Sequence, residues 1–222
     1  IHSHILPGID DGAPDIEASI TLIKGLMKFG VKKSVATPHI ISDMYRNNAQ
    51  TISAALNILK KELVKQKIKF EVSAAAEYMM DAYFFELLQQ KVPLLTIKDK
   101  IVLTEFSYAT MPSSPEKMSF AIITEGYSPI LAHPERYPYY YNDYKAFHRL
   151  ADLGFLLQVN LLSLTGYYGK EAVKAAIYIL KNGLVSYLGT DMHHERHLDA
   201  FNDAFQKDVF RKYLEGKEWN VF

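Results

Sequence analysis

The chain has 222 residues, of which 49% are hydrophobic and 23% charged, a composition typical of one folded globular domain. Its 25 lysines and arginines equal its 25 aspartates and glutamates, and this balance disfavours the broad positive surface that grips nucleic acid. It has no cysteine, which excludes disulfides and cysteine nucleophiles and fits the cytoplasm. No apolar run of membrane-spanning length or secretion-signal pattern is visible, so we expect neither a transmembrane segment nor export.

Seven amphipathic stretches predict helices. The first, residues 14–29, places Pro14 in a favourable first-turn position and lines Ile16, Ile20 and Ile23 along one face. The other stretches are residues 51–66, 82–91, 114–125, 143–153, 170–182 and 198–214.

Short apolar runs between these helices predict strands. They are residues 33–37, 69–75, 100–105, 129–132, 155–160 and 184–189, and the segment that begins at Ile1 resembles the end of a truncated first strand. Gly30, Gly126, Gly154 and Gly183 each stand between a helix and the next strand, where a left-handed residue ends a helix. Seven strands alternating with helices, without a Gly-rich dinucleotide turn, favour a closed parallel βα barrel in a single domain over residues 1–222.

Six of the seven predicted strands end in a histidine or an acid. These strand ends, together with one aspartate in the first loop, supply His2, His4, Asp11, His39, Glu77, Glu105, His133, Asp191 and His193. Active sites of such barrels lie at the carboxyl ends of the strands. Any one of these residues alone would be read as a solvated loop cap, but nine together favour a shared site.

The residue types point to bound cations. His2 and His4 are two residues apart, so on an extended segment both side chains point the same way and can grip one ion. Four converging carboxylates would repel one another without cations. At three or four protein ligands per metal, with one carboxylate bridging, nine ligands suit about three divalent ions.

The motifs HSHILPGIDDGA, ATPH, AAAE, LTEF, LAHPER and GTDMHH together resemble the polymerase-and-histidinol-phosphatase (PHP) superfamily. Within it they are most similar to bacterial manganese-dependent tyrosine phosphatases of capsule and exopolysaccharide systems. The resemblance implies a distorted seven-stranded, TIM-like (β/α)7 barrel with three metal ions, manganese being expected and iron or zinc also compatible with these ligands. It assigns His2, His4, Glu77 and Asp191 to the first ion, Glu77, Glu105 and His133 to the second, and Asp11, His39 and His193 to the third.

The same resemblance suggests residues that act on substrate. Arg136 of the HPER motif matches the phosphate-binding arginine of the family, and Arg196 is the candidate for a further basic residue after the DMH motif. His194 is a candidate to assist the leaving group. The tyrosines of residues 137–144 suit either a substrate rim or core packing, and His148 suits packing.

The expected reaction is attack of a metal-activated hydroxide on phosphotyrosine. The family implies a phosphotyrosyl protein substrate, in particular the tyrosine-rich tail of a bacterial tyrosine kinase that controls capsule or exopolysaccharide synthesis. The alternatives are a small-molecule phosphatase similar to histidinol phosphatase, a nuclease, which the neutral charge disfavours, and a non-catalytic binding module, which would have lost ligands. The turn IISDMYRNN, with Ile40, Ile41 and Asp43, departs from the polar or glycine-containing turn typical of the family.

Overall fold

The structure is a computed structural model that describes residues 1–216 and residue 220. Helices and strands follow one another in the predicted order, except that two of the predicted strands are each followed by a second strand and the last predicted helix is divided in two. The helices are α1 (Ile16–Lys28), α2 (Ala49–Lys65), α3 (Ala82–Gln89), α4 (Pro115–Thr124), α5 (Lys145–Asp152), α6 (Lys170–Lys181), α7 (Glu195–Gln206) and α8 (Val209–Leu214). The strands are β1 (Lys33–Ala36), β2 (His39–Ile40), β3 (Glu71–Ala74), β4 (Glu77–Met79), β5 (Ile101–Glu105), β6 (Ser128–Ala132), β7 (Leu156–Asn160) and β8 (Val185–Gly189).

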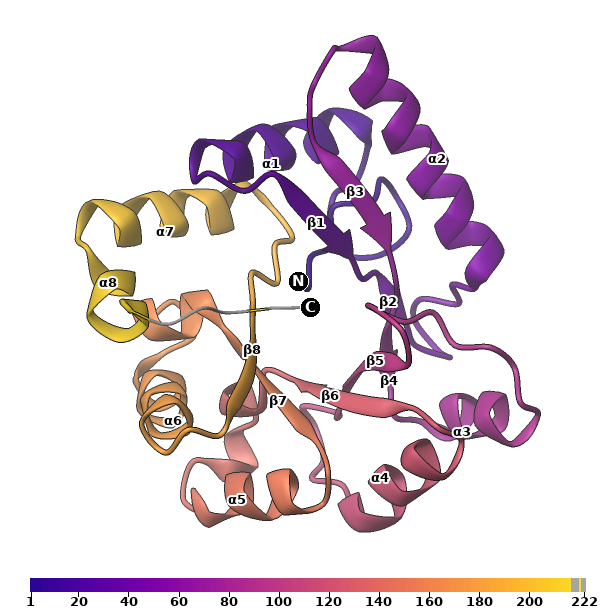
Figure 1. Cartoon of the computed structure of the whole chain (residues 1–222), viewed down its shortest axis with the longest axis vertical. Coiled ribbons are helices and arrows are strands. Elements are labelled where there is room, and N and C mark those ends of the chain that lie inside the picture. Colours follow the sequence, from indigo (N-terminus) through magenta and orange to yellow (C-terminus); the bar gives the residue numbers. More distant parts are fainter. Residues whose placement is uncertain (217–219, 221–222) are drawn as a thin grey trace.

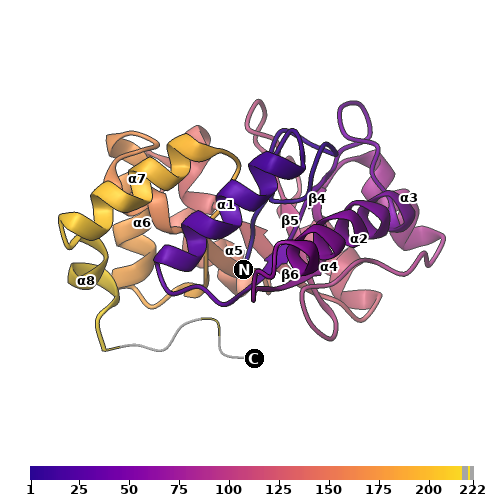
Figure 2. The ribbon, with the colours of Figure 1, turned by 90° about the horizontal axis from the view of Figure 1, so that it is seen from above.

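The strands lie at the centre and the helices surround them (Figure 1). Six strands form one parallel sheet in the order β2-β4-β5-β6-β7-β8, and β1 pairs with β3 in a separate two-stranded parallel sheet. Seen from above, α6, α7 and α8 gather on one side, and α2 and α3 on the other (Figure 2). This arrangement confirms an α/β fold with a parallel sheet.

The described strands do not close into one barrel ladder. The strands expected at residues 33–37 and 69–75 are each followed by a second, shorter strand, which belongs to the larger sheet. Pro38 separates β1 from β2, and its ring removes the backbone N–H that a continuous ladder would use. The first segment contributes one parallel bridge, Ser3 to Met192, and Thr37 N donates to Ser3 O at 2.7 Å, so this segment lies between the two sheets.

Local chemistry fixes where several helices begin and end. Asp15 accepts a hydrogen bond from Ala18 N at the start of α1, and Asp81 does the same for Phe84 N at the start of α3. The single helix expected over residues 198–214 is instead α7 and α8, because Asp208 adopts a left-handed backbone conformation with φ 55° between them.

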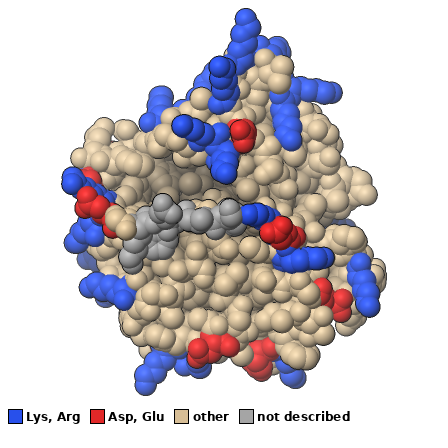
Figure 3. Space-filling view, in the orientation of Figure 1, with Lys and Arg blue, Asp and Glu red and all other residues tan. Residues whose placement is uncertain are grey.

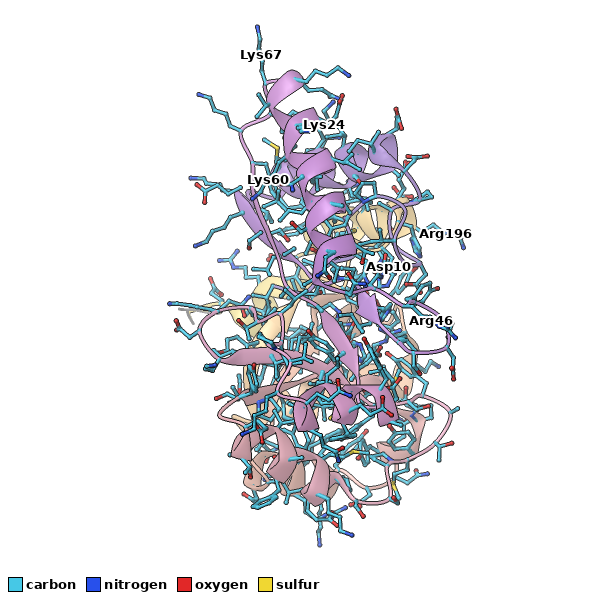
Figure 4. The ribbon with its side chains drawn as sticks, turned by 90° about the vertical axis from the view of Figure 1, so that its right-hand side faces the viewer. Asp10, Lys24, Arg46, Lys60, Lys67 and Arg196 are labelled. Atoms are coloured by element: carbon cyan, nitrogen blue, oxygen red, sulfur yellow. The ribbon has the colours of Figure 1, made fainter. Side chains whose placement is uncertain are left out.

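Charge is unevenly distributed although its total is zero. Nine lysines lie between residues 24 and 69, on or next to α1 and α2. Figure 3 shows lysines and arginines gathered at that end of the visible face, and Figure 4 labels Lys24, Lys60 and Lys67 there. Among the described residues, no helix is both long enough and apolar enough to span a bilayer.

Candidate metal centre

A cavity of about 260 Å³ opens where the polar strand ends meet. Its lining residues are Asp11, His39, Glu105, Tyr108, His133, Arg136, Tyr168, Asp191, His193, His194 and His197. His2, His4 and Glu77 are fully buried and contact two of these lining residues, Asp191 and His39. The structure therefore brings together all nine residues that the sequence selected as metal ligands.

Three groups of side chains have ligand atoms within 4.8 Å of one another. They are His2, His4, Glu77 and Asp191; His4, Asp11, His39 and His193; and His39, Glu77 and Glu105. The first group is the expected one, and the second adds His4 to the expected set. In the third group His39 stands where His133 was expected, although His133 Nε2 lies only 3.1 Å from Glu77 Oε1.

The side chains of His2 and His4 converge, but the backbone conformation that brings them together differs from the one that their spacing predicted. His2 Nε2 lies 3.2 Å from His4 Nε2 and 3.0 Å from Glu77 Oε2. His2 is not extended, however, because its φ is 67°, in the left-handed region. The expectation of an extended His-x-His segment was wrong in its backbone geometry, while the convergence of the two imidazoles is confirmed.

A layer of hydrogen bonds orients the imidazole rings. His2 Nδ1 donates to Gln158 Oε1 at 2.7 Å, and His4 Nδ1 donates to Asp10 Oδ2 at 2.7 Å, which leaves each Nε2 facing the cluster. The Tyr108 hydroxyl shares a hydrogen bond of 3.0 Å with His133 Nδ1. Such partners fix the tautomer and the orientation of metal-binding histidines. Sequence analysis missed all three of these partners.

Opposite charges inside the cluster shift its titrations strongly. Burial opposes ionisation of Glu77, but the imidazoles of His2 and His39 outweigh it and hold the Glu77 pKa well below its usual value. Burial likewise disfavours a charged His39, yet Glu77 and Glu105 raise its pKa to about 10. Burial and the charge of Glu77 together raise the pKa of Glu105. In the absence of metal ions, protons on His39 and Glu105 therefore offset the negative charge that bound cations would otherwise offset.

Three buried atoms of the cluster lack a hydrogen-bond partner among the described residues: His39 Nδ1, Glu105 Oε1 and Asp191 Oδ1. His39 Nδ1 and Glu105 Oε1 are only 3.0 Å apart, but they face each other without hydrogen-bond geometry. Buried ligand atoms that converge without bonding one another suit a shared cation. The residues present therefore fit a divalent-metal centre.

Arg136 lies at the edge of the cluster. It ends the short helix η1 (Pro134–Arg136), which follows His133, and its Nη1 donates to Asp191 Oδ2 at 2.6 Å. Asn160 Nδ2 donates to the same oxygen at 2.8 Å. The guanidinium carbon lies 4.1 Å from the ring centroid of Tyr168. Arg136 thus lines the cavity, where a guanidinium can donate hydrogen bonds to an anion.

Two further predicted residues lie on or near α7. His194, its N-cap, lines the cavity. Arg196 is exposed, is not among the lining residues, and projects from the same edge as Arg46 (Figure 4). Its role near substrate stays a prediction. His197 also lines the cavity and accepts a hydrogen bond from His193 N at 3.2 Å.

The tyrosines of residues 137–144 do not line the cavity. Tyr137 is fully buried, and its hydroxyl donates to Ala132 O at 3.1 Å. The core-packing interpretation is the one the geometry supports for Tyr137 and Tyr140, and His148 likewise contacts the Tyr178 hydroxyl at 3.1 Å.

Known proteins resemble the chain over most of its length. A family model described as capsular polysaccharide synthesis, CpsB/CapC, matches residues 1–217. The tyrosine-protein phosphatase YwqE of Bacillus subtilis is 29% identical over 195 residues, covering 87% of this chain and 76% of that protein. The tyrosine-protein phosphatase CpsB of Streptococcus pneumoniae is 31% identical over 232 residues, covering 100% and 93%.

Solved structures give the same result. A chain from crystal structures of YwqE from Bacillus subtilis and CpsB from Streptococcus pneumoniae, described as unique metal-dependent tyrosine phosphatases, superposes with a TM-score of 0.85. It is 28% identical and covers 98% of this chain and 87% of that chain.

Proposed function

Because the chain belongs to the CpsB/CapC family of capsular polysaccharide synthesis, we propose that it is a metal-dependent protein-tyrosine phosphatase. The observation that carries the proposal is the meeting of buried histidines and carboxylates with Arg136 at one cavity. Cations and a guanidinium around one space suit a phosphate dianion. The names of the relatives supply the substrate class.

The proposed ligand sets are those that the family resemblance implies. They differ from the three groups of side chains in two places: His4 is left out of the second group, and His133, whose Nε2 lies 3.1 Å from Glu77 Oε1, replaces His39 in the third. We assign one ion to His2, His4, Glu77 and Asp191, one to Asp11, His39 and His193, and one to Glu77, Glu105 and His133. Three ions with mixed nitrogen and oxygen ligands suit manganese, with iron or zinc as alternatives. When bound, such ions lower the pKa of water and offset the charge of a phosphoryl group.

The chain's own residues then bind and orient the substrate. Arg136 donates hydrogen bonds to phosphoryl oxygens, while Asp191 and the flanking aromatic rings hold the guanidinium in place. Burial and the nearby His193 lower the pKa of His194, so this side chain is neutral and can donate a hydrogen bond to the departing oxygen. A phenolate leaves readily, so the reaction does not depend on a strong general acid. Arg196, at the outer edge, is the candidate contact for the rest of the substrate.

The wider proposal concerns fold and setting. We assign residues 1–222 to a single PHP domain with a distorted seven-stranded barrel. In this count β1 with β2 and β3 with β4 are each one interrupted strand, and the first segment is the seventh strand. The substrate we propose is the phosphotyrosyl tail of a bacterial tyrosine kinase in the capsule or exopolysaccharide pathway. A kinase tail is phosphorylated where ATP is present, so the proposed location is the cytoplasm.

The decisive experiment combines metal analysis with substrate choice. The protein purified with manganese is assayed against a phosphotyrosyl peptide, histidinol phosphate and DNA ends, and its metal content is measured. We expect hydrolysis of the peptide, loss of activity with a chelator, and bound manganese. Hydrolysis of histidinol phosphate without hydrolysis of the peptide would show a small-molecule phosphatase instead.

A further inference from the structure

Tyr168 is held in a tight turn between the short helix η3 (Leu161–Thr165) and α6. The turn is Gly166–Gly169, closed by a 2.9 Å hydrogen bond from Gly169 N to Gly166 O. Gly166 and Gly169 have φ values of 89° and 93°, which glycine adopts without strain. The two glycines therefore fix the direction in which the intervening side chains leave the turn, and Tyr168 lines the cavity.

The ring of Tyr168 packs on Arg136. Its centroid lies 4.1 Å from the guanidinium carbon, and the ring of Tyr108 lies 5.1 Å from the same atom. Cation–π attraction to both rings restricts the guanidinium. The two tyrosines differ in their hydroxyls, because that of Tyr108 already bonds His133 Nδ1.

The Tyr168 hydroxyl is buried and has no hydrogen-bond partner among the described residues, although Tyr168 lines the cavity beside Arg136. A buried hydroxyl without a partner is costly unless a ligand completes it. Burial also raises the Tyr168 pKa, so the oxygen keeps its proton and can act as a donor. Packing of the ring on the guanidinium keeps Tyr168 beside Arg136 at the cavity.

We propose that Tyr168 is a substrate-binding residue whose hydroxyl donates a hydrogen bond to the same phosphoryl group that Arg136 holds. The inference rests on the proposed function in one respect only, namely that the cavity receives a phosphoryl group. Tyr168 then has two tasks: its ring positions Arg136 and its hydroxyl contacts the phosphoryl oxygen directly.

The test compares Tyr168→Phe with wild type and with Tyr167→Phe, all loaded with manganese. Tyr168→Phe keeps the ring on Arg136 and removes only the hydroxyl. Tyr167→Phe makes the same chemical change one residue away, at a side chain that is 40% exposed and does not line the cavity. Inorganic phosphate binding is measured by calorimetry, kcat and KM with a phosphotyrosyl peptide, and metal content by elemental analysis.

A hydrogen bond to a charged group predicts that Tyr168→Phe weakens phosphate binding roughly 10- to 100-fold and lowers kcat/KM comparably. Metal content stays unchanged, and Tyr167→Phe behaves as wild type. Unchanged phosphate binding in Tyr168→Phe would overturn the proposal. The dependence of kcat on the leaving-group pKa, measured with a series of aryl phosphates, could also be steeper in Tyr168→Phe than in wild type while phosphate binding is unchanged. That result would assign the hydroxyl to the leaving oxygen and would equally overturn the proposal.

Failure of the proposed function looks different. In that case the wild-type protein does not hydrolyse the phosphotyrosyl peptide, whereas phosphate binding by wild type and Tyr168→Phe still differ. Loss of metal from Tyr168→Phe would also overturn the inference, because weaker phosphate binding would then follow from the missing ions.

Discussion

Glu135 is a buried carboxyl group that belongs to none of the three candidate ligand groups, and its titration affects stability. It lies in η1 between two residues of the candidate site and is fully buried. Asn160 N donates to its Oε1 at 2.8 Å and the Ser163 hydroxyl at 2.6 Å, while its Oε2 has no hydrogen-bond partner among the described residues. Burial outweighs these two hydrogen bonds and raises the Glu135 pKa from 4.5 to about 7.

This shift makes the free energy of unfolding depend on pH. Below pH 4.5 the carboxyl is protonated in both states and contributes no slope. Between pH 4.5 and about 7 the unfolded chain releases the proton while the folded chain keeps it, so stability falls as pH rises. Above that window the loss is complete, and a shift of this size corresponds to about 3 kcal/mol.

Glu135→Gln removes the titration and keeps an oxygen for the two donors. We therefore expect the stability of the variant relative to wild type to increase by about 3 kcal/mol between pH 4.5 and pH 8. Urea unfolding is measured at several pH values with a chelator present throughout, so that metal binding does not vary. Glu171→Gln, which removes an exposed carboxylate on α6, controls for the change in net charge. A difference between Glu135→Gln and wild type that is constant across this range would refute the raised pKa.

Three further predictions concern the proposed metal and phosphate sites. Arg136→Ala should lower kcat/KM by about 10²- to 10³-fold, because a preorganised donor at the developing charge is lost, with metal content unchanged by elemental analysis; an unaffected rate would remove Arg136 from the mechanism. The Glu77→Gln variant should lose most of its bound metal on dialysis, because Glu77 contacts His2, His39 and His133 and belongs to two of the three ligand groups. A full metal content in this variant would contradict the assignment of Glu77 to two ions. Metal affinity should rise between pH 6 and pH 8, because ions displace protons from residues such as His39, whose metal-free pKa is raised to about 10. Calorimetry in buffers of different ionisation heat measures this proton release, and its absence would show that the histidines are already neutral.

The sequence selected nine residues that the structure brings together, because the signal of each is local. A polar residue that ends an apolar strand is visible without knowing the strand's neighbours, and parallel strands bring those ends to one edge. Gln158 and Asn160 carried the same kind of signal, because they alternate within the otherwise apolar strand β7. Side-chain amides are not typical metal ligands, so this signal does not select them. Asp10 and Asp11 carry the same signal, and the sequence alone does not show that Asp10 orients His4 while Asp11 lines the cavity.

The tyrosines that line the cavity could not be found this way. Tyr137 directly follows Arg136, yet its hydroxyl is satisfied by Ala132 O and Phe106 N in the core. Tyr168 comes from a turn 32 residues further along the chain and meets Arg136 only because the fold places that turn at the cavity. Proximity along the chain left both a substrate rim and core packing open for Tyr137, since side-chain direction depends on turns that composition does not specify.

The candidate metal centre also bears on how the fold is held together. Backbone hydrogen bonds join the first segment to the end of the sheet, from His4 N to Met192 O at 2.8 Å and from Asp191 N to His2 O at 2.9 Å. The same segment accepts from Thr37 N, so it connects the two sheets where the strand ladder is interrupted. An ion held by His2, His4, Glu77 and Asp191 would link that segment to the large sheet through side chains. An ion that binds only the folded chain stabilises it by mass action. Metal binding and folding are then thermodynamically coupled. Ligand variants that lower activity must therefore be compared at equal metal occupancy before a catalytic role is assigned to any one side chain.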